Sequence, residues 1–182
     1  IIGTEFKYGT TKEWLGLANN SILTAVLGKW TPYFAIFLLV YAILALVYFG
    51  LCGVPFVGNA MVAVLASLLF LVSCFAVGII FISLNGNFRY CLSNSAFYVA
   101  MGFAFAGITF PTMSMPLFAK IYGALLPLSH WIQIMLDQTF RNFPFVYDLK
   151  HFVAMILFVA FGFATLIRLK KLALDEKRWY QE

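Results

Sequence analysis

Long apolar stretches separated by short polar breaks dominate the chain, and they differ from the one-sided periodicity of helices in soluble proteins. No Asp, Glu, Lys or Arg occurs between Lys29 and Arg89, or between Arg89 and Lys120. The first of these gaps holds enough residues for two crossings of a bilayer, at about 20 residues each, and a short turn. The pattern therefore predicts an all-α, polytopic membrane protein.

The apolar stretches predict four transmembrane helices. Three of them lie at residues 31–51, 59–84 and 93–110, and the fourth lies at residues 149–169. Gly53 and Pro55 belong to a tight turn after the first helix, and a polar loop that carries Arg89 follows the second. The chain is thus divided into a cytoplasmic segment (1–30), three helices with short loops (31–110), an extracytoplasmic region (111–148), the last transmembrane helix (149–169) and a cytoplasmic tail (170–182).

The N-terminal segment is mixed and partly amphipathic. Asn19 and Asn20 interrupt its pattern, and Ser21 is a suitable N-cap for a second helix that continues into the membrane. Because the chain starts at Ile1 without a signal-peptide pattern, we expect it to be a fragment of a longer protein.

The region from residue 111 to residue 148 contains proline breaks and is too polar for a clean crossing. After Ser129 the apolar residues recur at helical spacing, at Trp131, Ile132, Met135 and Leu136. The opposite stripe is polar and consists of His130, Gln133, Asp137 and Arg141, the last two at the spacing that favours a helical ion pair. A helix with one polar face, bounded by prolines, is typical of a re-entrant or interfacial element. We therefore predict an extracytoplasmic re-entrant helical hairpin.

The distribution of basic residues predicts the orientation. With the N-terminal segment in the cytoplasm, nine of the 12 Lys and Arg residues lie inside, and only Lys120, Arg141 and Lys150 lie outside. Basic residues are retained on the cytoplasmic side of membrane proteins, and the inverted topology would reverse this count.

Composition and motifs exclude several functions. The chain is 63% hydrophobic and 10% charged, which is not the composition of a soluble domain. Its net charge of +5 is interpreted as a result of the topology, so no nucleic-acid partner is expected. Cys52, Cys74 and Cys91 fit no disulfide or zinc pattern, and we predict no metal site. No phosphate-binding GxxxxGK[ST] motif occurs, so the chain is not expected to hydrolyse ATP itself.

Five stretches carry a resemblance to a known family: GTTKEWL, LGKWTPY, GVPFVGN, AGITFPTMSMP and LPLSHWIQIMLDQTFRN. In this order they resemble the ABC-2 type permeases, the membrane subunits of ATP-driven exporters, and are most similar to bacterial multidrug exporters. The resemblance implies a permease of the bacterial inner membrane with no ATPase site or cofactor of its own. Its partners would be ATP-binding subunits, which hold ATP and magnesium, and a second permease copy, identical or homologous.

The resemblance also implies two functional regions. A coupling region that rests on the ATP-binding subunit corresponds to Gly9, Thr10, Glu13 and Leu15. A break that forms a lid near the exit of the transport path corresponds to Gly107, Phe110, Pro111, Met115 and Pro116. Because proline donates no backbone hydrogen bond, such a break persists at membrane depth only where protein or water covers the freed groups.

Three alternatives stay open. A fragment of a secondary transporter would carry ionisable residues inside its spans, and the three helices predicted between residues 31 and 110 contain none. A membrane-embedded enzyme would use His130 and Asp137, but no GxSxG or HExxH motif supports it. A purely structural membrane partner would not change the ATP turnover of an associated subunit.

Small residues in the predicted helices are expected to allow close approach of neighbouring helices in the membrane. The glycines to which this interpretation applies are Gly50, Gly78, Gly102, Gly107 and Gly162.

Overall fold

The computed structural model describes residues 2–107 and 114–174, and the regular elements within these residues are helices. Three helices are long and apolar enough to cross a membrane, namely Ile22–Leu51, Ala60–Leu84 and Phe145–Leu174. The predicted all-α fold is confirmed, and the first, second and last predicted spans each correspond to one of these helices.

Two short helices precede the first apolar helix. α1 (Ile2–Tyr8) and α2 (Thr11–Leu17) are joined through Gly9, whose φ of 69° lies in the left-handed region that glycine adopts without strain. α3 (Ile22–Ala45) follows Ser21, whose side chain accepts a hydrogen bond from the Thr24 amide. The predicted cap at Ser21 is therefore confirmed.

The first apolar helix extends beyond the predicted span at its N-terminal side. It starts at Ile22, directly after the predicted cap, passes through Pro32, and continues beyond α3 as a π-helical segment, η1 (Leu46–Leu51). The hydroxyl of Thr31 donates a hydrogen bond to the carbonyl of Leu27 at 2.8 Å, close to the position where Pro32 interrupts the backbone ladder. A helix that begins after Ser21 and continues into the apolar stretch is the arrangement that the sequence predicted.

The second apolar helix leads directly into another helix rather than into a polar loop. α4 (Ala60–Asn85) is capped by the side chain of Asn59 and ends at Gly86, which has a φ of 65°. α5 (Phe88–Phe105) begins at once, with Asn87 as its N-cap. The predicted loop around Arg89 is thus helical, and α5 is not among the helices apolar enough to cross a membrane, so the fourth crossing is not confirmed.

A pair of short helices occupies the region in which the hairpin was predicted. α6 (Leu117–Ala124) is followed by α7 (Pro127–Leu136) and by a π-helical segment, η3 (Asp137–Arg141). The helical pair agrees with the sequence pattern, while its re-entrant placement in the bilayer stays a prediction. α8 (Phe145–Leu174) begins before and ends after the predicted last span.

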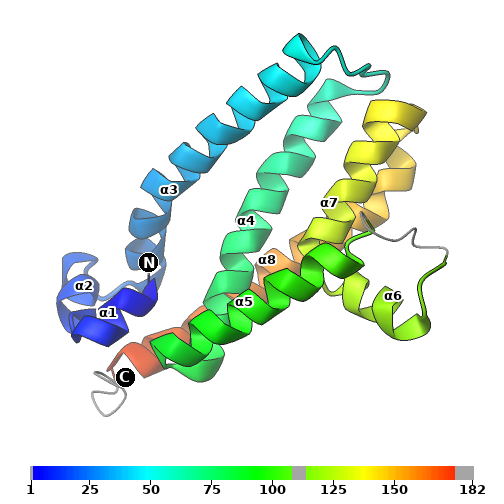
Figure 1. Cartoon of the computed structure of the whole chain (residues 1–182). Coiled ribbons are helices and arrows are strands. Elements are labelled where there is room, and N and C mark those ends of the chain that lie inside the picture. Colours follow the sequence, from blue (N-terminus) through cyan, green and yellow to red (C-terminus); the bar gives the residue numbers. More distant parts are fainter. Residues whose placement is uncertain (1, 108–113, 175–182) are drawn as a thin grey trace.

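α4, α7 and α8 form the centre of the molecule (Figure 1). α4 packs against α8 over much of its length, and a Cβ atom at Gly162 of α8 would come within 2.6 Å of the Cβ atom of Ala76 of α4. The hydroxyl of Ser73 on α4 donates to the carbonyl of Met155 on α8 at 3.2 Å. Contact at glycine and an inter-helix hydrogen bond are the usual means by which helices associate in lipid.

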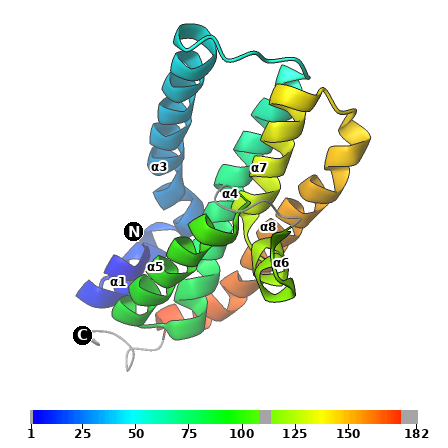
Figure 2. The ribbon, with the colours of Figure 1, turned by 45° about the vertical axis from the view of Figure 1, so that its right-hand side comes forward.

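α3 stands apart from α7 and α8 in Figures 1 and 2, and its buried residues, Ala25, Val26 and Trp30, lie near its N-terminal end. In the most apolar 18-residue stretch of Ile22–Leu51, none of the residues is buried. α1 and α2 lie at the foot of α3, beside the C-terminal end of α8 (Figure 2). α3 is therefore buried only near its N-terminal end.

Candidate functional sites

A compact cluster at the foot of the molecule connects the two N-terminal helices to three apolar helices. We call it the base cluster; its buried members are Ile2, Phe6, Trp14, Leu15, Ala25, Val26, Trp30, Ile79, Ile82, Leu166, Leu169, Leu172 and Ala173. These residues come from α1, α2, α3, α4 and α8. Because closely packed interiors transmit strain, a displacement of α2 would also shift one end of each apolar helix.

Polar contacts reinforce the base cluster at the turn between α1 and α2. The Thr10 hydroxyl donates to the Glu5 carboxylate, which also forms an ion pair with Lys29 of α3. The indole nitrogen of Trp14 donates to the carbonyl of Ala25 at 3.2 Å, and the Lys29 ammonium lies 5.3 Å from the centre of the Trp14 ring. α2 is thereby tied to the first turns of α3 through both polar and aromatic contacts.

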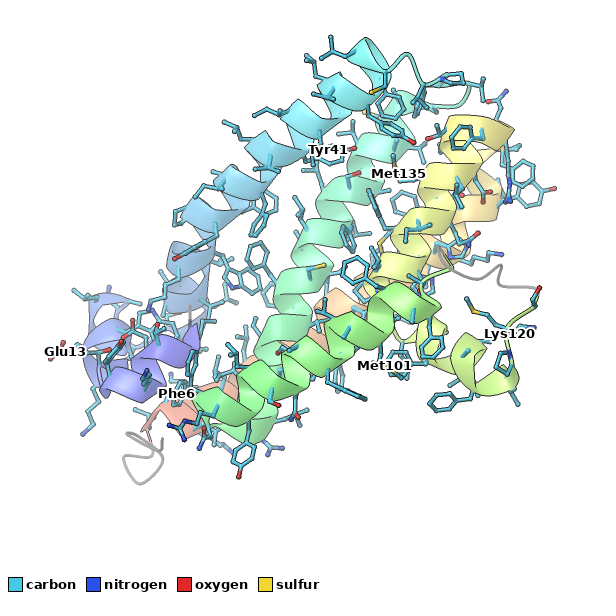
Figure 3. All side chains as sticks on the ribbon, viewed as in Figure 1. Phe6, Glu13, Tyr41, Met101, Lys120 and Met135 are labelled. Atoms are coloured by element: carbon cyan, nitrogen blue, oxygen red, sulfur yellow. The ribbon has the colours of Figure 1, made fainter. Side chains whose placement is uncertain are left out.

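The structure separates the four residues of the predicted coupling region. Gly9 and Thr10 form the turn, and Leu15 is only 1% exposed because it belongs to the base cluster. Glu13 is exposed and points away from the helices (Figure 3). On the same exposed side, Leu17 is 91% exposed, a residue that sequence reasoning did not select. The accessible surface of α2 therefore contains Glu13 and Leu17, while Leu15 holds the helix in place.

An apolar cavity of about 460 Å³ lies between α3 and α7. Its walls include Tyr41, Leu44 and Tyr48 on one side and Trp131, Met135 and Phe140 on the other. Tyr41 and Met135 lie at a similar height on the two helices in Figure 3. Sequence reasoning missed this cavity, which forms because the free part of α3 stands away from α7.

A chain of three polar side chains crosses the edge of this apolar cavity. The Trp131 indole nitrogen donates to the Ser67 hydroxyl at 3.0 Å, and the Ser67 hydroxyl lies 2.8 Å from the Tyr41 hydroxyl. Trp131, Ser67 and Tyr41 belong to α7, α4 and α3, so these hydrogen bonds connect the leaning helix to the centre. The lone polar groups of Tyr41 and Ser67 within apolar stretches were the signal that could have revealed them.

The predicted exit lid is only partly described. Gly107 has a φ of 91°, which suits a sharp change of direction after α5. Met115 is buried, and Pro116 precedes the first turn of α6, a position at which the missing amide donor costs nothing. Phe110 and Pro111 lie outside the described residues, so their assignment stays a prediction.

The polar stripe predicted on α7 divides into two parts. Asp137 and Arg141 form an ion pair at 2.8 Å at the end of the helix, as their spacing predicted, and Asp137 is buried. His130 and Gln133 instead line a second cavity, between α6, α7 and α8. Burial lowers the pKa of the His130 imidazole, and its hydrogen bond to the carbonyl of Ala124 offsets part of this effect.

His130 does not lie alone. Its Nδ1 atom is 3.0 Å from the Nδ1 atom of His151 on α8, a residue that sequence reasoning missed although it is ionisable and lies in an apolar stretch. Among the described residues, no third His, Cys, Asp or Glu joins the pair in a group that could hold a metal ion. The pair therefore connects two helices rather than forming a metal centre by itself.

The comparison with known families identifies the chain. The sequence model described as ABC-2 family transporter protein matches residues 6–168, which cover α2 to α7 entirely and most of α8. The chain belongs to the ABC-2 transporter family. No curated protein and no solved structure matches it.

Membership in the ABC-2 family agrees with the geometry. The family consists of membrane transport components, and the chain has three helices long and apolar enough to cross a membrane. The ABC-2 match also includes the base cluster from Phe6 to Leu166 and both cavities. The chain is thus a multi-pass transport permease.

Proposed function

We propose that this chain is the permease subunit of an ATP-driven exporter that moves an amphipathic, drug-like substrate outward across the bacterial inner membrane. A partner subunit would bind ATP and magnesium and hydrolyse the ATP, and a second permease copy would complete the transport path. The observation that carries the proposal is the base cluster, because it connects the accessible surface of α2 to all three apolar helices.

The base cluster suggests how ATP hydrolysis would be coupled to transport. Closure of the ATP-binding subunits would push on α2 near Glu13, and the cluster would pass this displacement to the foot of α3 and to the end of α8. α3 is the helix that would move most, since it is buried only at its foot and the Tyr41 hydroxyl makes its hydrogen bond to the central helices further along. Its tilt would change the width of the apolar cavity between Tyr41 and Trp131.

The apolar cavity supports an amphipathic substrate. Its described walls are aliphatic and aromatic apart from the hydroxyls of Tyr41, Tyr48 and Thr139 and the indole nitrogen of Trp131. Binding sites for drug-like molecules usually combine apolar and aromatic walls with a few polar groups. A substrate shifts the equilibrium between two arrangements of α3 only if it contacts them differently, and a cavity bounded by α3 meets this condition.

The exposed face of α3 is the surface on which we place the second permease copy. Ile36, Leu39 and Ile43 are among its exposed apolar side chains. In a bilayer these side chains tolerate lipid, so exposure alone does not define the contact. The position of α3 at the side of the molecule (Figure 1) leaves it accessible to a neighbouring subunit.

A secondary transporter is the second candidate, because His151 places an ionisable residue inside an apolar helix. The two candidates differ in their energy source. Vesicles that contain the full-length protein and its co-purified ATP-binding subunit would be loaded with ethidium as a drug-like probe. We expect ethidium movement to require ATP and to persist when an ionophore removes the proton gradient. Transport that follows the gradient without ATP would favour the secondary transporter.

Substitution of Glu13 tests the coupling role in the same vesicles. Glu13→Lys reverses the charge at the exposed surface of α2 and should leave insertion intact, because Glu13 makes no contribution to the base cluster. We expect it to abolish the stimulation of ATP turnover by substrate. Lys120→Glu, a charge reversal at an exposed position of α6 on the side of the molecule away from α3, is the control and should keep normal coupling. Unchanged coupling in Glu13→Lys would contradict the assignment.

A further inference from the structure

A second cavity of about 460 Å³ lies between α6, α7 and α8, on a different face of α7 from the apolar cavity. We call it the cationic cavity; its polar lining residues are Lys120, Ser129, His130, Gln133, Lys150 and His151. Figure 3 shows Lys120 on α6, at the side of the molecule away from α3. The remaining walls are small or apolar and include Phe105 and Met115.

The charges around this cavity are of one sign. Among the described residues that line it, two are lysines and none is a carboxylate. Within the described part of the chain neither Lys120 nor Lys150 forms an ion pair. Of the two nearby acids, Asp137 pairs with Arg141, and Asp148 accepts a hydrogen bond from the uncharged amide of Gln138 on one carboxylate oxygen. Among the described residues, the positive charges of Lys120 and Lys150 are therefore not held in an ion pair.

Hydrogen-bond donors accompany these charges. The Ser129 hydroxyl is buried at the cavity wall and has no hydrogen-bond partner among the described residues. The Nε2 atom of His130 lies 3.0 Å from the carbonyl oxygen of Ala124, which can only accept, so Nε2 carries the hydrogen. In neutral His130 the Nδ1 atom is then an acceptor, and it receives the Nδ1 hydrogen of His151. A further proton would make the pair cationic beside the two lysines.

The position of the cavity along α8 corresponds to the surface of a membrane. α8 has 30 residues and is ~45 Å long, and Lys150 and His151 lie ~9 Å from its start. A bilayer is about 40–45 Å thick with its headgroups and about 30 Å thick without them. If α8 spans the bilayer, the cavity lies where phospholipid phosphates meet the hydrocarbon. Basic pockets between membrane helices at this depth suit anionic headgroups.

We propose that the cationic cavity binds a phosphate group, supplied by the headgroup of an anionic phospholipid in the leaflet that surrounds the start of α8. Lys120 and Lys150 provide the charge, and Gln133 and Ser129 provide uncharged donors. Charge-assisted hydrogen bonds to phosphate are about twice as strong as neutral ones, so the two lysines dominate the affinity. Free phosphate has the same chemistry and is the other source to be distinguished.

Binding to the delipidated chain in neutral detergent tests this proposal without any ATP-binding partner, so its outcome is independent of the proposed transport function. Phosphatidylglycerol and phosphatidylcholine would be titrated and bound lipid counted by native mass spectrometry. Inorganic phosphate would be tested separately, by the thermal unfolding midpoint relative to chloride at equal ionic strength. We expect phosphatidylglycerol to bind more tightly than phosphatidylcholine, and the double variant Lys120→Gln/Lys150→Gln to weaken its binding by about tenfold or more.

The matched control is Lys170→Gln/Lys171→Gln, which removes two lysines at the other end of α8 and should bind like the unmodified chain. If the double variant does not fold, Lys120→Gln alone replaces it, since Lys120 is exposed on a short helix. A lysine-dependent effect of phosphatidylglycerol assigns the site to lipid, and one of phosphate alone assigns it to a soluble anion. Equal binding of both lipids with no effect of phosphate, or equal losses in variant and control, would overturn the proposal.

Discussion

The side-chain nitrogen of Gln138 lies 2.6 Å from a carboxylate oxygen of Asp148, and both side chains are buried. Gln138 makes three further hydrogen bonds. Its side-chain nitrogen donates to the Phe143 carbonyl at 3.0 Å, its side-chain oxygen accepts from the Asn59 amide at 2.9 Å, and its backbone oxygen accepts from the Gly58 amide at 2.8 Å. Its Cα atom also lies where a side chain at Gly58 would be. One residue therefore joins the turn before α4, the end of α7 and the start of α8.

Replacement of Gln138 by alanine should destabilise the chain. Gln138→Ala leaves the Asn59 amide and the buried Asp148 carboxylate without their partner, and each unsatisfied buried group costs about 1–3 kcal/mol. The thermal unfolding midpoint in detergent measures this loss. Asn94→Ala removes an exposed amide from α5 and is the control, which should unfold like the unmodified chain. Similar midpoints for both variants would contradict the central role of Gln138.

The contact between α4 and α8 predicts opposite effects at two glycines. Gly162→Ala places a methyl group within 2.6 Å of the Ala76 Cβ atom, so the helices must separate, at a cost of about 1–3 kcal/mol. At Gly78 of α4 nothing lies within 4 Å of the added methyl group. Gly78→Ala should therefore be neutral, or stabilising by up to about 1 kcal/mol, since alanine favours helix. Unfolding midpoints of the two variants provide the measurement, and equal destabilisation would show that the helix contact lies elsewhere.

These two glycines also show that the sequence pattern does not predict which face of an apolar helix meets its neighbour. Both were predicted to lie at a helix contact, and only Gly162 does. An apolar helix is hydrophobic on every side, so its pattern defines length but not the face that meets a neighbour. A local signal did place the start of α3 beside Ser21, because a capping side chain acts on its own helix.

In the candidate sites, too, the sequence predicted contacts within one helix but not contacts between two helices. Helical spacing predicted the polar stripe of α7 and the ion pair of Asp137 with Arg141. The partner of His130 is His151, which lies 21 residues further along the chain, and only the packing of α7 on α8 brings them together. α5 was predicted to start too late because Arg89 and its polar neighbours were interpreted as a loop, although Asn87 is a suitable N-cap. The sequence therefore predicted features that depend on a single helix, and it did not predict the contacts between helices.

Cysteine labelling tests the topology that the basic residues predict. In a background without Cys52, Cys74 and Cys91, single cysteines would replace Lys120, Arg141, Arg89 and Lys171, all of which are exposed. A membrane-impermeant maleimide added to intact cells should label Lys120→Cys and Arg141→Cys. Arg89→Cys and Lys171→Cys should react only after the cells are opened, because basic-rich segments stay in the cytoplasm.

The labelling pattern also decides the role of α5. A chain in which positions 89 and 171 lie inside and positions 120 and 141 lie outside must cross the membrane between Arg89 and Lys120. Labelling of Arg89→Cys and Lys120→Cys from the same side would exclude that crossing and leave the three apolar helices as the spans. The reverse pattern at all four positions would contradict the orientation.

Leu15 and Leu17 separate the packing of α2 from its contact with a partner. Leu15 is buried in the base cluster, so Leu15→Ala should cost about 2–5 kcal/mol and lower the unfolding midpoint of the chain alone. Leu17 is exposed on the same helix, and Leu17→Ala should leave that midpoint unchanged. The two substitutions remove the same atoms, so any difference arises from their surroundings.

The same pair has a second readout in the presence of the ATP-binding subunit. If α2 is the docking helix, Leu17→Ala should reduce the amount of that subunit that co-purifies, although the permease itself is as stable as before. A loss of co-purification in Leu15→Ala must be compared with its loss of folded protein, since both follow from a displaced helix. Full retention of the subunit by Leu17→Ala and by Glu13→Lys together would mean that the partner binds another surface, and that the base cluster serves only to hold the helices at their foot.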